Sequence, residues 1–453
     1  MKRLFTLVLL LSLSIATFAQ SPNAILDSIR KYPNLAYPVA STYPGIPFGE
    51  IKSAPEGFEP FYFSLVGRHG SRYERNEKYF RRAVNIFHKA DSLGILTEEG
   101  KLLHKKLVEI LNAQQGHDGE ISELGIEQWH NIGCRAYKNF KPVFDSGNIE
   151  AKSSTSLRCI FSMASFNDAI KGLQPNIKIS QLARESYLWM LRPLADDPSV
   201  SKEAVRIHKE YRKEGEWKDA RKEWEHTYNA SSFISKVTTN PKLFLEKCGA
   251  KYAFRAARYT FITLIFGENF GHGDRAMLTR LFTPEEMYGI YVYQTAPWVN
   301  GSVGRGNEVY EMRQAHMRPL VDDILNKAQA AVDGKNPDAA NLRFTHDTYM
   351  GPLYSVIGYD GCVPQWNENI ELAATSFNHG VYVPMASNVQ IVLYRNKQGK
   401  VLVRSLINER DVYLPIKSDT APFYSWSDFC KHVTNNLKEL EDAQSRVLKK
   451  YGK

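Results

Sequence analysis

Two histidines with charged neighbours are the side chains whose types and spacing best suit chemistry. The first lies in Arg68-His69-Gly70-Ser71-Arg72, where two guanidiniums flank one imidazole. A planar guanidinium binds a phosphate through two hydrogen bonds and always carries a positive charge. Nearby cations lower the pKa of an imidazole and favour its neutral, nucleophilic form at mildly acid pH. The cluster therefore predicts a nucleophile beside a bound anion, and the alternative is a surface loop with a few basic residues.

The second histidine lies in His346-Asp347, where an imidazole and a carboxyl group are adjacent. The imidazole can bind one phosphate oxygen. The carboxylic acid can protonate the leaving oxygen of a phosphate ester, which is a poor leaving group until it is protonated. The alternative is that Asp347 caps a helix that begins near Met350.

A third candidate is the hydroxyl-rich segment 153–158, which ends in Arg158 at the start of an expected helix. Helix N-termini bind anions, so Arg158 is suited to close a phosphate pocket from another strand end. Taken alone, the segment equally fits a surface arginine that opens a helix.

Each candidate follows a short apolar segment that is typical of a buried strand. The expected strands are 61–66, 149–153 and 341–345, and two further strands, 388–394 and 401–408, form a hairpin across 396–399. In open α/β sheets, ligands bind just beyond the carboxyl ends of the strands. We therefore expect the three candidates to lie around one hollow.

Helical spacing of apolar residues predicts the elements between these strands. The expected helices include one over 126–140 capped by Ser122, and others over 160–173, 319–332 and 426–449. The charged run 203–228 places Trp217 and Trp224 on one face, as in a solvated amphipathic helix. The composition divides the chain into an irregular Pro-rich arm at 20–58, an α/β core at 59–179 and 301–453, and a mostly helical insertion at 180–300.

Composition excludes several classes of protein. The 453 residues are 43% hydrophobic and 24% charged, which is a globular mixture. A net charge of +9 suits an anionic substrate, but no Lys/Arg run indicates nucleic-acid binding. The five cysteines contain no CxxC pair, which argues against a zinc ribbon, and they allow up to two disulfides or none.

The first 19 residues have the pattern of a secretory signal peptide. Lys2 and Arg3 precede an apolar run from Leu4 to Ile15, and small residues lead to an expected cleavage after Ala19. The run is shorter than the ~20 residues that span a bilayer. We therefore expect a secreted or periplasmic protein without a membrane span, and the sequence leaves its oligomeric state open.

The motif at residues 68–72, followed much later by His346-Asp347, resembles the motif pair of the histidine acid phosphatases, branch 2 of the histidine phosphatase superfamily. Residues 120–128 resemble the family's "LTxxGxxQ" helix start, and 154–165 resemble the segment that carries a third phosphate-binding arginine. Residues 384–394 are similar to the C-terminal strand of inositol polyphosphate phosphatases and phytases. The resemblance implies a phosphoglycerate mutase-like α/β fold, an open doubly wound mixed sheet with helices on both faces, plus a helical inserted domain.

The same resemblance implies roles for six residues. His69 corresponds to the nucleophile that becomes phosphohistidine, and Asp347 to the general acid that protonates the leaving oxygen and then helps to activate water. The phosphate clamp corresponds to Arg68, Arg72, Arg158 and His346. Three arginines can position and neutralise a phosphoryl group without a metal, so no metal and no cofactor are expected.

Two positions depart from the family pattern. Glu74 stands where the family often has proline, and a carboxylate there disfavours very highly charged substrates unless it points away. His346-Asp347-Thr348 stands where the inositol polyphosphate phosphatase subgroup usually has His-Ala-Glu, which favours the proton donor of phytases and acid phosphatases.

The leading hypothesis is a secreted phosphomonoesterase that acts on small anionic substrates, with inositol polyphosphates as the best single candidate. Within the same class, a broad-specificity acid phosphatase acting on sugar or other small phosphate esters is the alternative. A metal-dependent HD-type phosphohydrolase would need further histidine and aspartate ligands beside His346-Asp347. A protein that binds phosphate esters without turnover is the alternative from another class. Because Asp347 must be protonated to act as a donor, we expect an acid pH preference.

Overall fold

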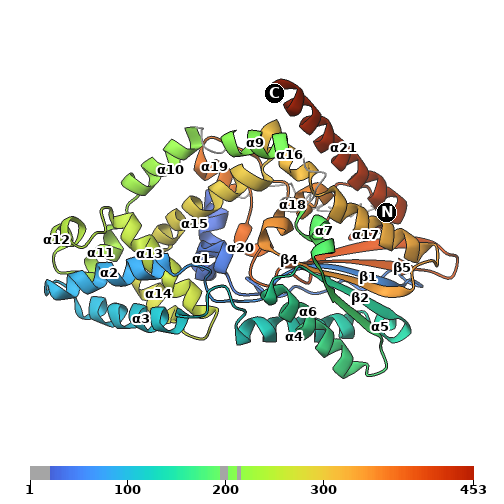
Figure 1. The fold of residues 1–453 in the computed structure, drawn as a ribbon, viewed down its shortest axis with the longest axis horizontal. Coiled ribbons are helices and arrows are strands. Elements are labelled where there is room, and N and C mark those ends of the chain that lie inside the picture. The colour runs from blue at the N-terminus through green and yellow to red at the C-terminus, as the bar shows by residue number, and fades with distance from the viewer. Residues whose placement is uncertain (1–20, 194–201, 212–215, 453) are drawn as a thin grey trace, which may run out of the picture.

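The computed structural model describes residues 21–193, 202–211 and 216–452. The expected signal peptide, residues 1–19, lies outside the described residues. The described chain forms a sheet flanked by helices at one end and a group of helices at the other (Figure 1). The expected fold class is confirmed, because the sheet is mixed and carries helices on both faces.

The sheet has eight strands in the order β3-β2-β4-β1-β5-β6-β7, and β8 pairs with β6. Pairing is parallel among β3, β2, β4 and β1, and antiparallel from β1 outward through β5 and β6. All five expected strands are present. The strand bounds are β1 Glu59–Arg68, β2 Asn148–Ser153, β3 Ile179–Ala183, β4 Asp338–Thr345, β5 Asn388–Arg395, β6 Val401–Ile407, β7 Arg410–Asp411 and β8 Phe423–Ser425.

The central strand β1 is apolar on both faces because helices cover both. Phe63 and Leu65 pack into one core, and Tyr62 and Val66 pack into the other, as the two-residue period of a strand requires. Helices α4, α5 and α6 lie on the first face, and α17, α18 and α21 lie on the second (Figure 1). Buried Ser64 accepts a hydrogen bond from Arg343 on β4, so the polar side chain within β1 is satisfied.

The helices follow the expected positions closely. Helix α4 begins after Ser122, whose hydroxyl accepts a hydrogen bond from the Gly125 amide, as expected of its cap. The α-helix bounds are α1 Pro22–Lys31, α2 Lys78–Ser92, α3 Glu98–Gln114, α4 Glu123–Asn139, α5 Lys141–Ser146, α6 Leu157–Leu173, α7 Leu188–Leu191, α9 Lys202–Tyr211, α10 Glu216–Thr227, α11 Ser231–Val237, α12 Pro241–Lys247, α13 Ala253–Glu268, α14 Arg275–Leu281, α15 Pro284–Trp298, α16 Glu308–Ala315, α17 Arg318–Val332, α18 Asp347–Ile357, α19 Ile370–Thr375, α20 His379–Tyr382 and α21 Trp426–Tyr451. Short 3-10 turns are η1 Pro33–Ala36, η2 Pro38–Ala40 and η3 Glu185–Tyr187, and η4 Val299–Val303 is a π-turn.

The helical end of the molecule draws on more of the chain than the segment 180–300. Helices α2 and α3 come from the stretch assigned to the α/β core, yet they pack against the buried helix α13. Strand β3 crosses the expected boundary near residue 180 and belongs to the sheet. The division of the chain into a core and an insertion, with boundaries at residues 180 and 300, stays a prediction.

The Pro-rich arm is more regular than expected. Ser21 caps α1 and Pro22 occupies its first turn, a position where the missing amide hydrogen costs nothing. Ile25 and Ile29 lie four residues apart on the buried face of α1, which packs against α15. The two 3-10 turns that follow then carry the arm to the carboxyl edge of the sheet.

All five cysteines are free thiols in the structure, three of them buried. Within the described ranges, every helix is too short or too polar to cross a bilayer.

Candidate active site

The register of the parallel strands brings the three candidate clusters to one edge. Arg68, the last residue of β1, pairs with Thr345 at the end of β4, and Ser153 of β2 pairs with the neighbouring Phe344. The residues that follow these strand ends therefore meet. His69, Arg72, Arg158, His346 and Asp347 all line a cavity of about 410 Å³.

Backbone and buried side-chain contacts fix the loop that carries His69. The amides of Arg68 and His69 donate to the carbonyls of Ser387 and Thr345, at 2.8 and 3.1 Å. The Gly70 amide donates to the Ser162 hydroxyl at 3.0 Å, and the Ser71 amide donates to the Gln128 side chain at 2.9 Å. Because these four amides are already bonded, they are not available to a phosphate in the cavity.

A close contact between two glycines sets the position of this loop on α4. A Cβ atom at Gly70 would lie 2.4 Å from the Gly125 carbonyl oxygen, and one at Gly125 would lie 2.1 Å from the Ser71 carbonyl oxygen. The Ser122 amide also donates to that Ser71 carbonyl. The segment 120–128, noted above for its helix-start pattern, is thus the support on which the histidine loop rests.

The imidazole of His69 is held in one tautomer. Its Nδ1 lies 2.9 Å from the carbonyl oxygen of Gly70, which can only accept, so Nδ1 carries the proton. Nε2 then keeps its lone pair toward the cavity. Burial and the cations Arg68, Arg72 and Arg158 hold the pKa of His69 well below its usual value, so the ring stays neutral in acid solution.

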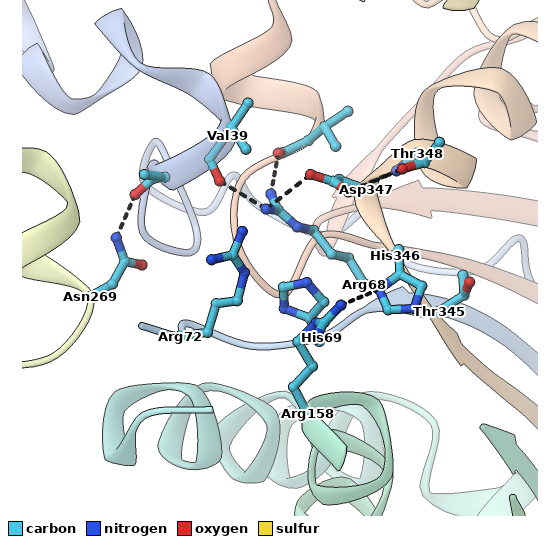
Figure 2. A network of polar contacts seen from close by, with 12 residues as sticks. Val39, Arg68, His69, Arg72, Arg158, Asn269, Thr345, His346, Asp347 and Thr348 are labelled. Atoms are coloured by element: carbon cyan, nitrogen blue, oxygen red, sulfur yellow. Dashed lines mark hydrogen bonds and ion pairs between the residues drawn. The ribbon is translucent and has the colours of Figure 1, made fainter. Parts of the chain in front are cut away.

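Arg68 lies behind the cavity wall and is fully buried. Its guanidinium donates to the carbonyls of Val383 and Val39, at 3.0 and 2.8 Å, and lies 3.3 Å from a carboxylate oxygen of Asp347 (Figure 2). The resemblance implied that Arg68 belongs to the phosphate clamp. In the structure its polar contacts are to the protein, and its direct ionic partner is Asp347.

Asp347 is the first residue of α18 and does not occupy its N-cap position. Its Oδ1 accepts from the Thr348 amide at 2.9 Å, and His346 occupies the cap position. Burial alone raises the pKa of Asp347, but Arg68, His69 and Arg72 outweigh it and hold the pKa well below the usual range. The carboxyl group is therefore ionised in the ligand-free protein.

His346, which follows β4, and Arg158, near the start of α6, lie beside His69 at the edge of the cavity. An Arg158 guanidinium nitrogen lies 3.4 Å from Nδ1 of His346, and the two imidazole rings are 5.7 Å apart (Figure 2). Burial and then Arg158 lower the pKa of His346 to about 3. The Nε atoms of Arg158 and Arg72, like that of Arg68, are buried and have no hydrogen-bond partner among the described residues. Arg158 and Arg72, unlike Arg68, also line the cavity.

Sequence reasoning missed several residues that build the site. Asn269 accepts from the Ser71 hydroxyl at 2.8 Å and donates to the Ala40 carbonyl at 2.8 Å (Figure 2). It lies in a glycine-rich stretch, residues 267–274. Tyr37 and Val39 of the arm, together with Arg192, also line the cavity. No local pattern marks these residues, because their partners lie far away in the chain.

Among the residues that the structure describes, no group of three His, Cys, Asp or Glu side chains is arranged to hold a metal ion. The additional ligands that an HD-type phosphohydrolase needs beside His346-Asp347 are thus not assembled in the described part of the chain.

Comparison with known proteins agrees with this geometry. The family model of the histidine phosphatase superfamily (branch 2) matches residues 63–408. The fold is similar to the Bifidobacterium longum multiple inositol polyphosphate phosphatase in complex with phosphate, with a TM-score of 0.73, 18% identity, and coverage of 89% of this chain and 98% of that one. For the same enzyme in complex with inositol hexasulfate, the TM-score is 0.70 and the identity is 17%, with coverage of 88% of this chain and 97% of that one.

The phytase from D. castellii is also similar, with a TM-score of 0.63, 15% identity, and coverage of 90% of this chain and 85% of that one. No curated protein sequence gives a significant match. At these identities, the structural likeness establishes the fold.

Proposed function

The chain is a phosphatase that belongs to branch 2 of the histidine phosphatase superfamily, and we propose that it hydrolyses phosphomonoesters through a phosphohistidine at His69. The observation that carries this proposal is the 2.9 Å contact between Nδ1 of His69 and the Gly70 carbonyl oxygen. Because Nδ1 donates to Gly70, Nε2 presents a lone pair to a cavity walled by Arg72, Arg158 and His346. Covalent catalysis of this kind replaces one difficult displacement by two easier ones.

In the first step, Nε2 of His69 attacks phosphorus and the ester bond to the leaving oxygen breaks. Arg72 and Arg158 neutralise the equatorial oxygens, where charge accumulates in the transition state. The carboxyl group of Asp347 gives its proton to the leaving oxygen. In the second step, the Asp347 carboxylate takes a proton from water, water attacks phosphorus, and the bond from Nε2 to phosphorus breaks.

The low pKa of Asp347 changes the reason for the expected acid preference. The ligand-free carboxyl group is ionised, so the proton for the leaving oxygen must enter with the substrate. A phosphate monoester has a second pKa of about 6. Its negative charge beside the carboxylate raises the pKa of Asp347 on binding, so the proton of a bound monoanion can pass to Asp347. The acid preference then follows the fraction of substrate present as monoanion.

For the substrate we propose inositol polyphosphates, with sugar and other small phosphate esters as the alternative. The cavity includes Arg75 and Arg192 beyond the arginines assigned to the scissile phosphate, which supports a ligand with more than one anionic group. The structural relative in complex with inositol hexasulfate supports the same class. We also propose secretion or a periplasmic location, on the strength of the signal peptide pattern at residues 1–19.

The test is replacement of His69 by alanine, with release of phosphate from inositol hexakisphosphate and p-nitrophenyl phosphate as the readout. We expect both activities to be lost, whereas the matched variant His130→Ala changes an exposed histidine on α4 and keeps both. In the wild type, rapid alkaline quenching of a reaction with a phosphorus-labelled ester should leave label on the peptide that contains His69. Retained activity in His69→Ala contradicts the assignment, and tight binding without turnover in the wild type favours a binding protein.

A further inference from the structure

A carboxylate other than that of Asp347 faces the cavity. Glu74 lines it, and its side chain is 16% exposed. One of its oxygens lies 3.6 Å from a guanidinium nitrogen of Arg72, which is too long for a hydrogen bond but close enough for an ion pair. A phosphate bound by Arg72 therefore has this carboxylate as a near neighbour.

The position of Glu74 is fixed by its backbone. Its amide donates to the side chain of Gln114 at 2.8 Å, and the same amide group of Gln114 donates back to the Glu74 carbonyl at 2.8 Å. Gln114 is fully buried, and the Gly119 amide donates to the same carbonyl at 3.0 Å. Three hydrogen bonds thus hold the backbone of Glu74 in place beside the cavity.

The two side-chain oxygens of Glu74 differ in their partners. Oε1 accepts from the Arg75 amide at 2.9 Å. Oε2, the oxygen near Arg72, accepts no hydrogen bond from the described residues, and the Glu74 side chain as a whole is partly exposed and lines the cavity. It can accept a hydrogen bond from a ligand hydroxyl, whereas a second phosphate at the same place would meet it as a like charge.

We propose that Glu74 selects phosphate esters that carry a free hydroxyl beside the scissile phosphate and disfavours a second phosphate at that position. This inference rests on the proposed function and narrows its substrate class to esters in which hydroxyls flank the reacting group. Arg75 and Arg192 also line the cavity, so further phosphates are accepted elsewhere on the ligand. Glu74 affects only the ligand position beside its carboxylate, where a hydroxyl is favoured over a phosphate.

Two inositol trisphosphate isomers of equal charge provide the test. In one, the three phosphates are contiguous, and in the other, phosphates and hydroxyls alternate around the ring. Their dissociation constants are measured by calorimetry at about pH 6, where an ordinary glutamate is ionised, on the His69→Ala protein so that no turnover occurs. We expect the alternating isomer to bind more tightly by roughly tenfold, the scale of one charge pair in a partly solvated site.

Adding Glu74→Gln should remove most of this preference, because the amide carries no charge. Adding Glu123→Gln, which removes the same charge from the exposed first turn of α4, should leave it unchanged. Equal affinities in the starting protein, a preference that survives Glu74→Gln, or no binding of either isomer overturns the inference. Failure of the proposed function is seen separately, as persistent phosphate release by the single variant His69→Ala or as no release by the wild type.

Discussion

Replacement of Asp347 by asparagine separates proton donation from phosphate binding. The carboxylate lies 3.3 Å from Arg68, which at an effective dielectric constant near 20 corresponds to a gross attraction of about 5 kcal/mol. The side chain of Asp347 is 27% exposed, so solvent reduces the net value. The variant loses this attraction and leaves the positive charge of Arg68 uncompensated beside the cavity. Binding of a phosphate dianion should therefore hold or improve.

The loss of turnover in Asp347→Asn should be larger for a substrate whose leaving oxygen must be protonated as it departs. General acid catalysis contributes about 10²–10⁴ in rate, equivalent to about 3–5.5 kcal/mol of the barrier. We expect kcat/KM for an inositol phosphate, whose leaving group is an alkoxide, to fall by this amount in Asp347→Asn. For p-nitrophenyl phosphate, whose leaving group is stable as an anion, kcat/KM should fall by roughly tenfold or less, because kcat/KM reports phosphoryl transfer to His69 and not the later hydrolysis in which Asp347 acts as a base.

The assay is a comparison of kcat and KM for both esters, with thermal unfolding as a check that the variant is folded. A similar loss of kcat/KM on both esters refutes the assignment of Asp347 as proton donor, whereas a similar loss of kcat alone reports its role as the base in the second step. A raised KM with unchanged kcat refutes it as well, because it would assign the carboxyl group to binding alone.

The parts of the site that follow strand ends were predictable from the sequence, because local patterns fix where strands stop. An apolar run ending before Arg68, and another ending before His346, placed both histidines at a carboxyl edge before their partners were known. The parallel register of β1 and β4 then brings them together. The same reasoning placed Arg158 at the start of a helix, and it is the second residue of α6.

What each arginine contacts could not be read from residue type. The motif groups Arg68 with Arg72, yet Arg68 is directed to Val39, Val383 and Asp347. Two of these partners come from segments more than two hundred residues apart from each other. The contribution of the arm and of Asn269 was missed for the same reason, since a hydrogen bond between distant segments leaves no periodic signal in either.

Two further predictions concern packing and pH. In Gly70→Ala, the new Cβ would meet Gly125 backbone atoms at 2.4–2.8 Å, so we expect a loss of stability of about 1–3 kcal/mol and a large loss of kcat/KM. Gly172→Ala, at an α6 position with nothing within 4 Å, should be neutral or stabilising by up to about 1 kcal/mol, and an equal effect of both changes in denaturant unfolding would contradict this packing. Burial lowers the pKa of His379 to about 3 in the folded protein, whereas an unfolded histidine titrates near 6.5. Between these two values the unfolded chain binds a proton that the folded chain does not, so stability is fully present above about pH 6.5 and decreases as the pH falls. The contribution of one such histidine is about 1.4 kcal/mol per pH unit. His379→Gln should therefore flatten the dependence of the unfolding free energy on pH by about this slope between pH ~6 and ~4, measured in phosphate-free buffer because a bound anion stabilises the native state. An unchanged slope would mean that the buried ring is protonated in the folded protein, at a place where Arg68 already supplies a positive charge.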